Sequence, residues 1–230
     1  TRIEAVENQQ LRDQFINSLG FSNDQRASGQ VQFNPPYPYG DPDNEKAAVI
    51  GRLKTRFVPT PALSHTDVML VLHGCSHEVA DSICNYGFAQ INFSDNGWFG
   101  KGLYCTTYAE YACKYAKGGP AVSTPPKPRN EHGEYVVVVA WAAPGNCYPI
   151  SRCTDYLSPL DPASHSKYYT APGAVAHHLE NNFQSHYACI SARTFQCQDG
   201  VRDGVDADFD ELVVQGTTQL MPCYRLYFTA

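Results

Sequence analysis

Hydrophobic periodicity along the chain predicts a mixture of early helices and later strands. Apolar side chains recur at near-helical spacing over residues 4–19, and Gly20 supplies a natural helix end. A short apolar run at residues 68–72 has the length of a buried strand and leads directly into His73. Residues 21–47, which are rich in Asn, Gln, Gly and Pro, show neither period. We therefore expect one amphipathic helix, an irregular loop and then a strand.

The middle of the chain predicts two more helices and its clearest strand. Residues 77–86 carry apolar side chains on one helical face, with Ser76 available as N-cap and Gly87 beyond the end. A further helix is expected over residues 107–116. The β-branched run at residues 134–141 predicts a strand that is buried on both faces.

The last third of the chain is dominated by short strand candidates, at residues 187–191, 211–215 and 223–228. An aspartate-rich loop at residues 198–208 joins the first two, and a weak helical pattern precedes them around residues 174–183. Internal repeats and a strand-helix-strand alternation are both missing from the sequence. This order of elements predicts an α+β fold, and 230 residues suit a single domain.

Composition and charge exclude several classes of function. The formal net charge is -6, and acidic and basic residues are scattered, so a nucleic acid is not expected as a partner. The sequence has no apolar run of membrane-spanning length, so no membrane association is expected. The first residues lack the basic and apolar regions of a secretory signal, and we expect an intracellular protein of the cytoplasm or nucleus.

The nine cysteines are odd in number and irregularly spaced, which favours reduced thiols over a disulfide framework. His73, Cys75, His77 and Cys84 lie close together in sequence, but no C-x-x-C pair accompanies them. We therefore expect no metal. A nucleophilic pair made of Cys75 and His77 stays open as an alternative, although no third orienting group can be identified.

Four short motifs together resemble the catalytic domain of the poly(ADP-ribose) polymerase family. They are His73-Gly-Cys-Ser after a buried strand, Ile83-x-x-x-Gly-Phe after a helix, Gly100-Lys-Gly-Leu-Tyr and Glu211-Leu-Val-Val. Their order and spacing also fit this family. The resemblance implies an ADP-ribosyltransferase fold, in which two packed, mainly antiparallel sheets surround an NAD cleft and helices flank them.

The same resemblance implies which residues would act on NAD⁺, the expected co-substrate. Its catalytic residues would be Glu211, His73 and Tyr104. The residues implied to contact NAD⁺ are His73, Gly74, Cys75, Gly102, Tyr104 and Tyr115.

Each of these roles has a chemical reason. Cleavage of the bond between nicotinamide and ribose develops positive charge on the sugar, so a carboxylate such as Glu211 is useful there. Tyr104 and Tyr115 would stack on the nicotinamide ring, whereas we assign Tyr108 and Tyr111 to core packing. By resemblance, the backbone of Gly74 would hold the nicotinamide amide.

His73 and two departures from the family pattern complete the expected site. By resemblance, His73 would bond a hydroxyl of the adenosine ribose, a task that needs a fixed tautomer. Ala112 stands where much of the family has a serine, and Cys75 stands where Ser or Thr is usual. Losing a hydrogen bond at a buried polar group could cost on the order of 1 kcal/mol in NAD⁺ affinity, unless water or another side chain replaces it.

The resemblance implies an NAD⁺-dependent protein ADP-ribosyltransferase that releases nicotinamide and modifies a protein substrate, or itself. The short loop at residues 89–98 and the single-module layout favour mono- over poly-ADP-ribosylation. Two alternatives remain: a module that binds NAD⁺ or ADP-ribose without turnover, and an NAD⁺ glycohydrolase. Because the loop at residues 198–208 leads into Glu211, we expect it to border the acceptor site and to favour a basic target surface.

Overall fold

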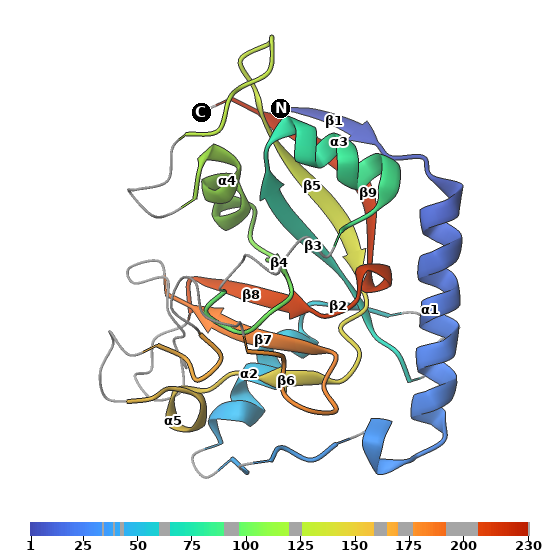
Figure 1. The fold of residues 1–230 in the computed structure, drawn as a ribbon, viewed down its shortest axis with the longest axis vertical. Coiled ribbons are helices and arrows are strands. Elements are labelled where there is room, and N and C mark those ends of the chain that lie inside the picture. Colours follow the sequence, from blue (N-terminus) through green and yellow to red (C-terminus); the bar gives the residue numbers. More distant parts are fainter. Residues whose placement is uncertain are drawn as a thin grey trace.

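The computed structural model describes residues 1–33, 35–38, 40–41, 44–59, 65–89, 97–119, 126–158, 165–169, 177–191 and 207–229. Its strands form two sheets (Figure 1). The five-stranded sheet has the order β1 (Arg2–Ala5), β9 (Leu220–Phe228), β5 (Tyr135–Ala142), β3 (Val68–Cys75) and β2 (Phe57–Val58), and all its pairs are antiparallel.

The second sheet has four strands, in the order β4 (Leu103–Cys105), β8 (Phe209–Val214), β7 (Ser185–Ile190) and β6 (Cys147–Pro149). Its β6–β7 pair is parallel and its other pairs are antiparallel. The α-helices are α1 (Gln9–Ala27), α2 (Glu45–Lys54), α3 (His77–Tyr86), α4 (Ala109–Lys117) and α5 (Arg152–Asp155), and the short 3-10 helices are η1 (Val31–Phe33) and η2 (Thr217–Gln219). The expected α+β class is confirmed.

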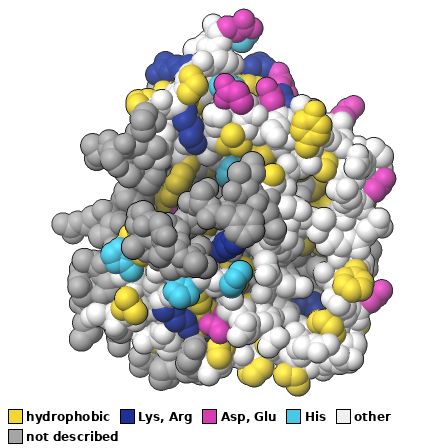
Figure 2. Space-filling model, in the orientation of Figure 1, with side chains coloured by type: hydrophobic (Ala, Val, Ile, Leu, Met, Phe, Trp, Pro, Cys, Tyr) yellow, Lys and Arg dark blue, Asp and Glu magenta, His cyan; other side chains and the backbone are white. Residues whose placement is uncertain are grey.

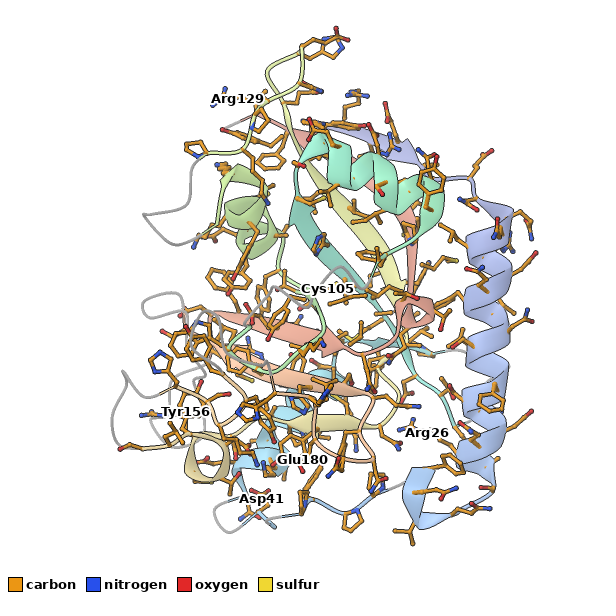
Figure 3. The ribbon with its side chains drawn as sticks, in the orientation of Figure 1. Arg26, Asp41, Cys105, Arg129, Tyr156 and Glu180 are labelled. Atoms are coloured by element: carbon orange, nitrogen blue, oxygen red, sulfur yellow. The ribbon has the colours of Figure 1, made fainter. Side chains whose placement is uncertain are left out.

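The main hydrophobic core lies between the two sheets. It combines Val71 and Val138 of the first sheet with Leu212 and Val214 of the second, and all four are buried. Cys105, labelled near the centre of Figure 3, belongs to the same core. The apolar runs that predicted buried strands therefore become the facing surfaces of two sheets.

One short backbone contact connects the sheets beside His73. Leu72 N–H donates to Thr106 O at 2.7 Å, and Thr106 N–H donates to Leu72 O at 3.0 Å. Because Thr106 directly follows β4, this pair fixes the C-terminal half of β3 next to the strand that carries Tyr104. The two sheets thus deliver the predicted catalytic residues to one region.

The predicted first helix was wrong at both ends. Residues 2–5 pair with β9 as β1, and α1 begins after Asn8, whose side chain accepts a hydrogen bond from Leu11 N–H at 3.2 Å. The helix then passes through Gly20 to Ala27. Strand pairing and the Asn8 cap decided the start, and a helix tolerates a single glycine at modest cost.

Helix α2 begins at the end of the region predicted as an irregular loop, residues 21–47, and continues to Lys54, where the sequence predicted no element. Its Val49 and Leu53 are buried in the main core, as expected for an amphipathic helix. Its first residues, Glu45 and Lys46, are fully buried as well. Two charged side chains obscured the helical pattern, because charged residues are rarely buried without a partner.

The remaining predictions divide between the described residues and those outside them. Helices α3 and α4 and strands β3, β5, β7, β8 and β9 are confirmed within a few residues. The helix predicted from the weak pattern at residues 174–183 is wrong for residues 177–183, which form no helix. Most of the predicted loops at 89–98 and 198–208 lies outside the described residues.

Candidate active site

The predicted His73 and Tyr104 are joined by a hydrogen bond. His73 Nδ1 lies 2.9 Å from the backbone O of Tyr104. Because a carbonyl oxygen only accepts, Nδ1 carries the proton and Nε2 is the acceptor nitrogen. Burial lowers the pKa of His73 below its usual range, so the ring stays neutral near pH 7. A ring held in one neutral tautomer suits a binding role, in which Nε2 accepts from a hydroxyl group.

Glu211 lies on the same sheet face as Tyr104. In the β4–β8 register Tyr104 is opposite Val213, and Glu211 is two residues from Val213 along β8. Residues two apart in a strand share a face, so Tyr104 and Glu211 are diagonal neighbours, with a spacing of roughly 7–8 Å. Glu211 is only 7% exposed. The fold therefore brings His73, Tyr104 and Glu211 together from three separate strands.

The Tyr104 phenol folds the preceding loop back onto β4. It accepts a hydrogen bond from Phe99 N–H at 3.0 Å and donates one to Gly100 O at 2.7 Å. Gly100 has φ +105°, a left-handed conformation that favours glycine. The Gly-Lys-Gly motif thus has a structural reason, since it allows the tight turn that positions Tyr104.

On the side of β3 away from β5, no strand among the described residues pairs with Gly74. The N–H and C=O of Leu72 face Thr106, on the side of β3 away from β5. Backbone groups alternate in direction along an antiparallel strand, so the N–H and C=O of Gly74 face the same way as those of Leu72. This edge can offer one donor and one acceptor to a planar amide, which fits the role implied for Gly74.

Gly74 also has a steric requirement that predicts a large effect of substitution. A Cβ at this position would lie 2.0 Å from Ala112 O and 2.7 Å from Ala116 N. Gly74→Ala is therefore expected to push α4 away from β3 and to lower the free energy of unfolding by about 1–3 kcal/mol. Urea denaturation measures this. Gly20→Ala is the matched control, because a Cβ on Gly20 of α1 would have nothing within 4 Å, and it should stabilise the chain slightly. Equal effects of the two substitutions would contradict the prediction.

Two of the residues predicted to contact NAD⁺, Cys75 and Gly102, have packing roles in the structure. The Cys75 side chain is buried in the main core, and burial raises the pKa of its thiol to about 12. A thiol with that pKa is a poor nucleophile at neutral pH, which argues against the alternative pair with His77. His77 Nε2 is instead 2.9 Å from Glu134 O. A Cβ on Gly102 would lie 2.6 Å from Val214 O, so Gly102 serves close packing on β8.

Tyr115 and Tyr111 both reach Glu211 from α4. The Tyr115 hydroxyl lies 3.4 Å from Glu211 Oε1, and its ring is half-exposed, as a ring that stacks on a ligand must be. Tyr111 donates to Glu211 Oε1 at 2.5 Å, although its ring is buried. The assignment of Tyr111 to core packing is confirmed, and its hydroxyl contacts Glu211 in addition. Its spacing of four residues from Tyr115 placed both on one helical face, and that signal could have found it.

Tyr108, the other tyrosine assigned to packing, is bound by two arginines. Its hydroxyl accepts hydrogen bonds from Arg52 and Arg56, both at 2.5 Å. Its ring contacts Phe209 edge-on, with the centroids 5.7 Å apart. Tyr108 thus connects α2 to the start of α4, which agrees with a structural role.

Lys127 provides a charge that the sequence prediction missed. Its Nζ donates to Tyr115 O at 2.8 Å and lies 3.5 Å from Gly74 O. An ammonium group at the C-terminal turn of α4 is favourable because the last helix carbonyls lack partners within the helix. Burial lowers the pKa of Lys127. Lys127 therefore connects the Gly74 edge to the helix that carries Tyr111 and Tyr115.

His186 fixes the loop before Tyr104 from the opposite side. Its Nδ1–H donates to Phe99 O at 2.7 Å, and its Nε2 accepts from Glu180 N–H at 2.8 Å. Burial lowers the pKa of His186 to about 4. A proton on Nε2 would also face the Glu180 N–H donor, so the neutral ring fits these two bonds.

This arrangement predicts a pH dependence of stability. As the pH falls, the unfolded chain binds a proton at His186 near pH 6.5, whereas the folded chain binds it only near pH 4. The contribution of neutral His186 is therefore complete above pH 6.5 and is lost as the pH falls toward 4. We expect the free energy of unfolding to fall over that window by on the order of 2–3 kcal/mol from this residue. Urea unfolding at a series of pH values measures it, and His186→Phe should show a shallower slope; an unchanged slope would refute the assignment.

A pocket of about 410 Å³ is lined by none of the three predicted catalytic residues, His73, Tyr104 and Glu211. Its lining comes from β1, α3, β9 and the segment before β5: Arg2, His77, Glu78, Asp81, Pro128, Arg129, Asn130, Glu131, His132 and Tyr227. The lining mixes both signs of charge. On the face shown in Figure 2, the Lys and Arg side chains of the described residues are likewise interspersed with acidic ones.

Two further properties of the described residues bear on possible ligands. Within the described ranges, no three His, Cys, Asp or Glu side chains gather closely enough to hold a metal ion. None of the helices in that part of the chain combines the length and the apolarity that crossing a membrane requires.

Comparison with known proteins identifies a family and solved structures of similar fold. Residues 47–228 match the family model described as the poly(ADP-ribose) polymerase catalytic domain. Among solved structures, the chain is similar to the PARP domain of Arabidopsis RADICAL-INDUCED CELL DEATH1, with 10% identity, a TM-score of 0.48, and coverage of 99% of this chain and 85% of that one. No curated protein matches the sequence.

Proposed function

Because this chain belongs to the poly(ADP-ribose) polymerase catalytic domain family, we propose that it is an NAD⁺-dependent protein ADP-ribosyltransferase. The observation that carries the proposal is the convergence of the family's three motif residues. His73 bonds Tyr104 O, and Tyr104 and Glu211 are diagonal neighbours on one face of the second sheet. The three residues come from strands far apart in the chain, so the sequence motifs alone do not imply that they lie close together.

The residues present fit both the nicotinamide group of NAD⁺ and the ribose attached to it. The strand edge at Gly74 offers a backbone donor and acceptor for the carboxamide, and the partly exposed Tyr115 offers a ring face. Tyr115 O and Gly74 O are both within 3.5 Å of Lys127 Nζ, and the Tyr115 hydroxyl is 3.4 Å from Glu211 Oε1. The amide edge, the ring and the carboxylate are therefore neighbours.

In the proposed reaction, the bond between C1′ of the ribose and the nicotinamide nitrogen breaks. Nicotinamide leaves with the bonding electron pair as a neutral molecule, and positive charge develops on the ribose. A nucleophilic group of the target protein donates its lone pair to C1′ and loses its proton to solvent. The Glu211 carboxylate stabilises the developing charge and can orient the ribose through its 2′-hydroxyl.

We propose that a single ADP-ribose unit is attached to each acceptor group, on another protein or on the chain itself, in the cytoplasm or nucleus. The short segment at residues 89–98 supports mono- over poly-ADP-ribosylation. The aspartate-rich segment at residues 198–208 precedes β8 in the sequence and favours a basic target surface.

A second candidate is a module that binds NAD⁺ without turnover. The observation that favours it is Ala112, which is buried and has no hydroxyl to offer to the carboxamide. An intact Glu211 in contact with two tyrosine hydroxyls favours the transferase instead. Transfer of ADP-ribose to water, which yields free ADP-ribose, is the third candidate.

Product analysis separates the three candidates. The purified chain is incubated with NAD⁺ labelled in its adenylate group, with and without a cell lysate as a source of targets. Release of nicotinamide together with label on protein supports the transferase, and the size of the protein-bound label distinguishes one unit from a polymer. Nicotinamide release with label only in free ADP-ribose supports hydrolysis. NAD⁺ binding by calorimetry without nicotinamide release supports the binding module.

A further inference from the structure

Helix α4 presents a pair of tyrosines to the carboxylate of Glu211. Tyr111 and Tyr115 are four residues apart, and their ring centroids lie 5.2 Å apart in an edge-on arrangement. Their hydroxyl oxygens are 3.3 Å apart. Glu211 Oε1 is 2.5 Å from the Tyr111 hydroxyl and 3.4 Å from the Tyr115 hydroxyl. The strongest contact of Glu211 in this pair is therefore with the tyrosine whose ring is buried.

Tyr111 is held much more firmly than Tyr115. Its ring is buried in the second core and stacks on Phe209, with a centroid distance of 4.9 Å and an interplanar angle of 18°. Phe209 lies two residues before Glu211 on the same face of β8. The hydroxyl of Tyr111 therefore has a fixed position relative to the strand that carries Glu211.

We propose that Tyr111 is a positioning residue for Glu211, because its phenol donates to Oε1 and holds the carboxylate ionised and in one orientation. The inference rests on the proposed function and adds a residue to it. A donor to a carboxylate stabilises the charged form, and charged hydrogen bonds are the stronger ones. Burial, together with the charge of Glu211, raises the pKa of Tyr111, so Tyr111 stays a donor at every working pH.

A purely structural hydrogen bond is the competing explanation, and the chain contains a matched example of one. Tyr187 is fully buried and donates to Asp210 Oδ2 at 2.8 Å. Asp210 directly precedes Glu211, so its side chain points to the opposite face of β8. There it accepts from Thr107 N–H at 2.7 Å, which fastens the β4–α4 connection to β8. Tyr187→Phe therefore removes a comparable hydroxyl without touching Glu211.

The experiment compares Tyr111→Phe and Tyr187→Phe with the parent chain. Nicotinamide release is measured against NAD⁺ concentration and pH, and the Glu211 carboxyl is titrated by 13C NMR, with Glu211→Gln assigning its signal. For Tyr111→Phe we expect kcat to fall about tenfold with KM changed less than twofold. We also expect the acid limb of the kcat profile and the Glu211 titration to move up by about one pH unit. Tyr187→Phe should change the thermal midpoint and leave these readouts as in the parent.

The outcomes separate this inference from the proposed function. Tyr111→Phe with the kcat, pH profile and carboxyl titration of the parent overturns the role of Tyr111. A parent that releases no nicotinamide overturns the proposed function, and the NMR titration then decides alone whether Tyr111 holds the carboxylate. If Tyr111→Phe does not fold, the phenolic proton of Tyr111 provides the test. It should resonate downfield in the parent and move upfield in Glu211→Gln, and an unchanged position would overturn the inference.

Discussion

Glu211→Gln is expected to release nicotinamide from NAD⁺ about 100-fold more slowly than the parent chain, or slower still. The reason is electrostatic. Positive charge develops on the ribose as nicotinamide leaves, and a fixed, buried carboxylate stabilises it far better than a neutral amide does. A factor of 100 corresponds to about 2.7 kcal/mol of transition-state stabilisation.

The same substitution is expected to leave the fold nearly intact. Glutamine keeps a side-chain oxygen that can accept from Tyr111, whose hydroxyl now lies 2.5 Å from Oε1. The thermal midpoint should therefore stay close to that of the parent, which isolates the loss of charge. Glu110→Gln is the matched control, because Glu110 is exposed on α4 and pairs with Lys114 at 3.3 Å. Parent-like nicotinamide release by Glu211→Gln would rule out its proposed role.

Asp155→Asn is expected to lower the free energy of unfolding by about 3–5 kcal/mol. Asp155 is fully buried, and its Oδ2 is 2.7 Å from Nζ of the equally buried Lys46. Burial raises the pKa of Asp155, but the Lys46 charge and hydrogen bonds from Ser151 N–H and the Tyr148 hydroxyl outweigh it, so the pKa is held below its usual range. Removing the carboxylate charge leaves the Lys46 ammonium without its close counter-charge.

The sign of the pH dependence provides a second readout. Burial lowers the pKa of Lys46, and Asp155 opposes that shift. Without the Asp155 charge, the folded chain should release the Lys46 proton at a lower pH than the unfolded chain does. The unfolded chain then binds more protons, so the stability of Asp155→Asn should recover as the pH rises toward about 10, the usual pKa of a lysine.

Urea unfolding over a pH series measures both effects. Asp81→Asn is the control, because Asp81 pairs with Arg225 at 3.0 Å and is largely exposed, so its loss should cost about 1 kcal/mol or less. If the two variants lost equal stability, the buried pair would have no special role in joining α2 to α5.

The sequence alone determined the elements whose pattern is local. The β-branched run that became β5 and the capped helix α3 were predictable because strand burial and helix capping act over a few residues. Motif spacing was sufficient to select His73, Tyr104 and Glu211 as a set. Glu45 and Lys46 defeated the same reasoning, because their burial depends on partners elsewhere in the chain, such as Asp155.

Only the tertiary structure decided which groups meet. β1 formed where a helix was expected, because pairing with β9 satisfies the backbone of residues 2–5. Strand register turned Glu211 toward Tyr104 and its neighbour Asp210 to the opposite face, a distinction set by the alternation of side chains. The packing of α4 then brought Tyr111 to Glu211, a contact between residues 100 positions apart. The sequence thus predicted the chemistry of the site, and long-range pairing and packing fixed its geometry.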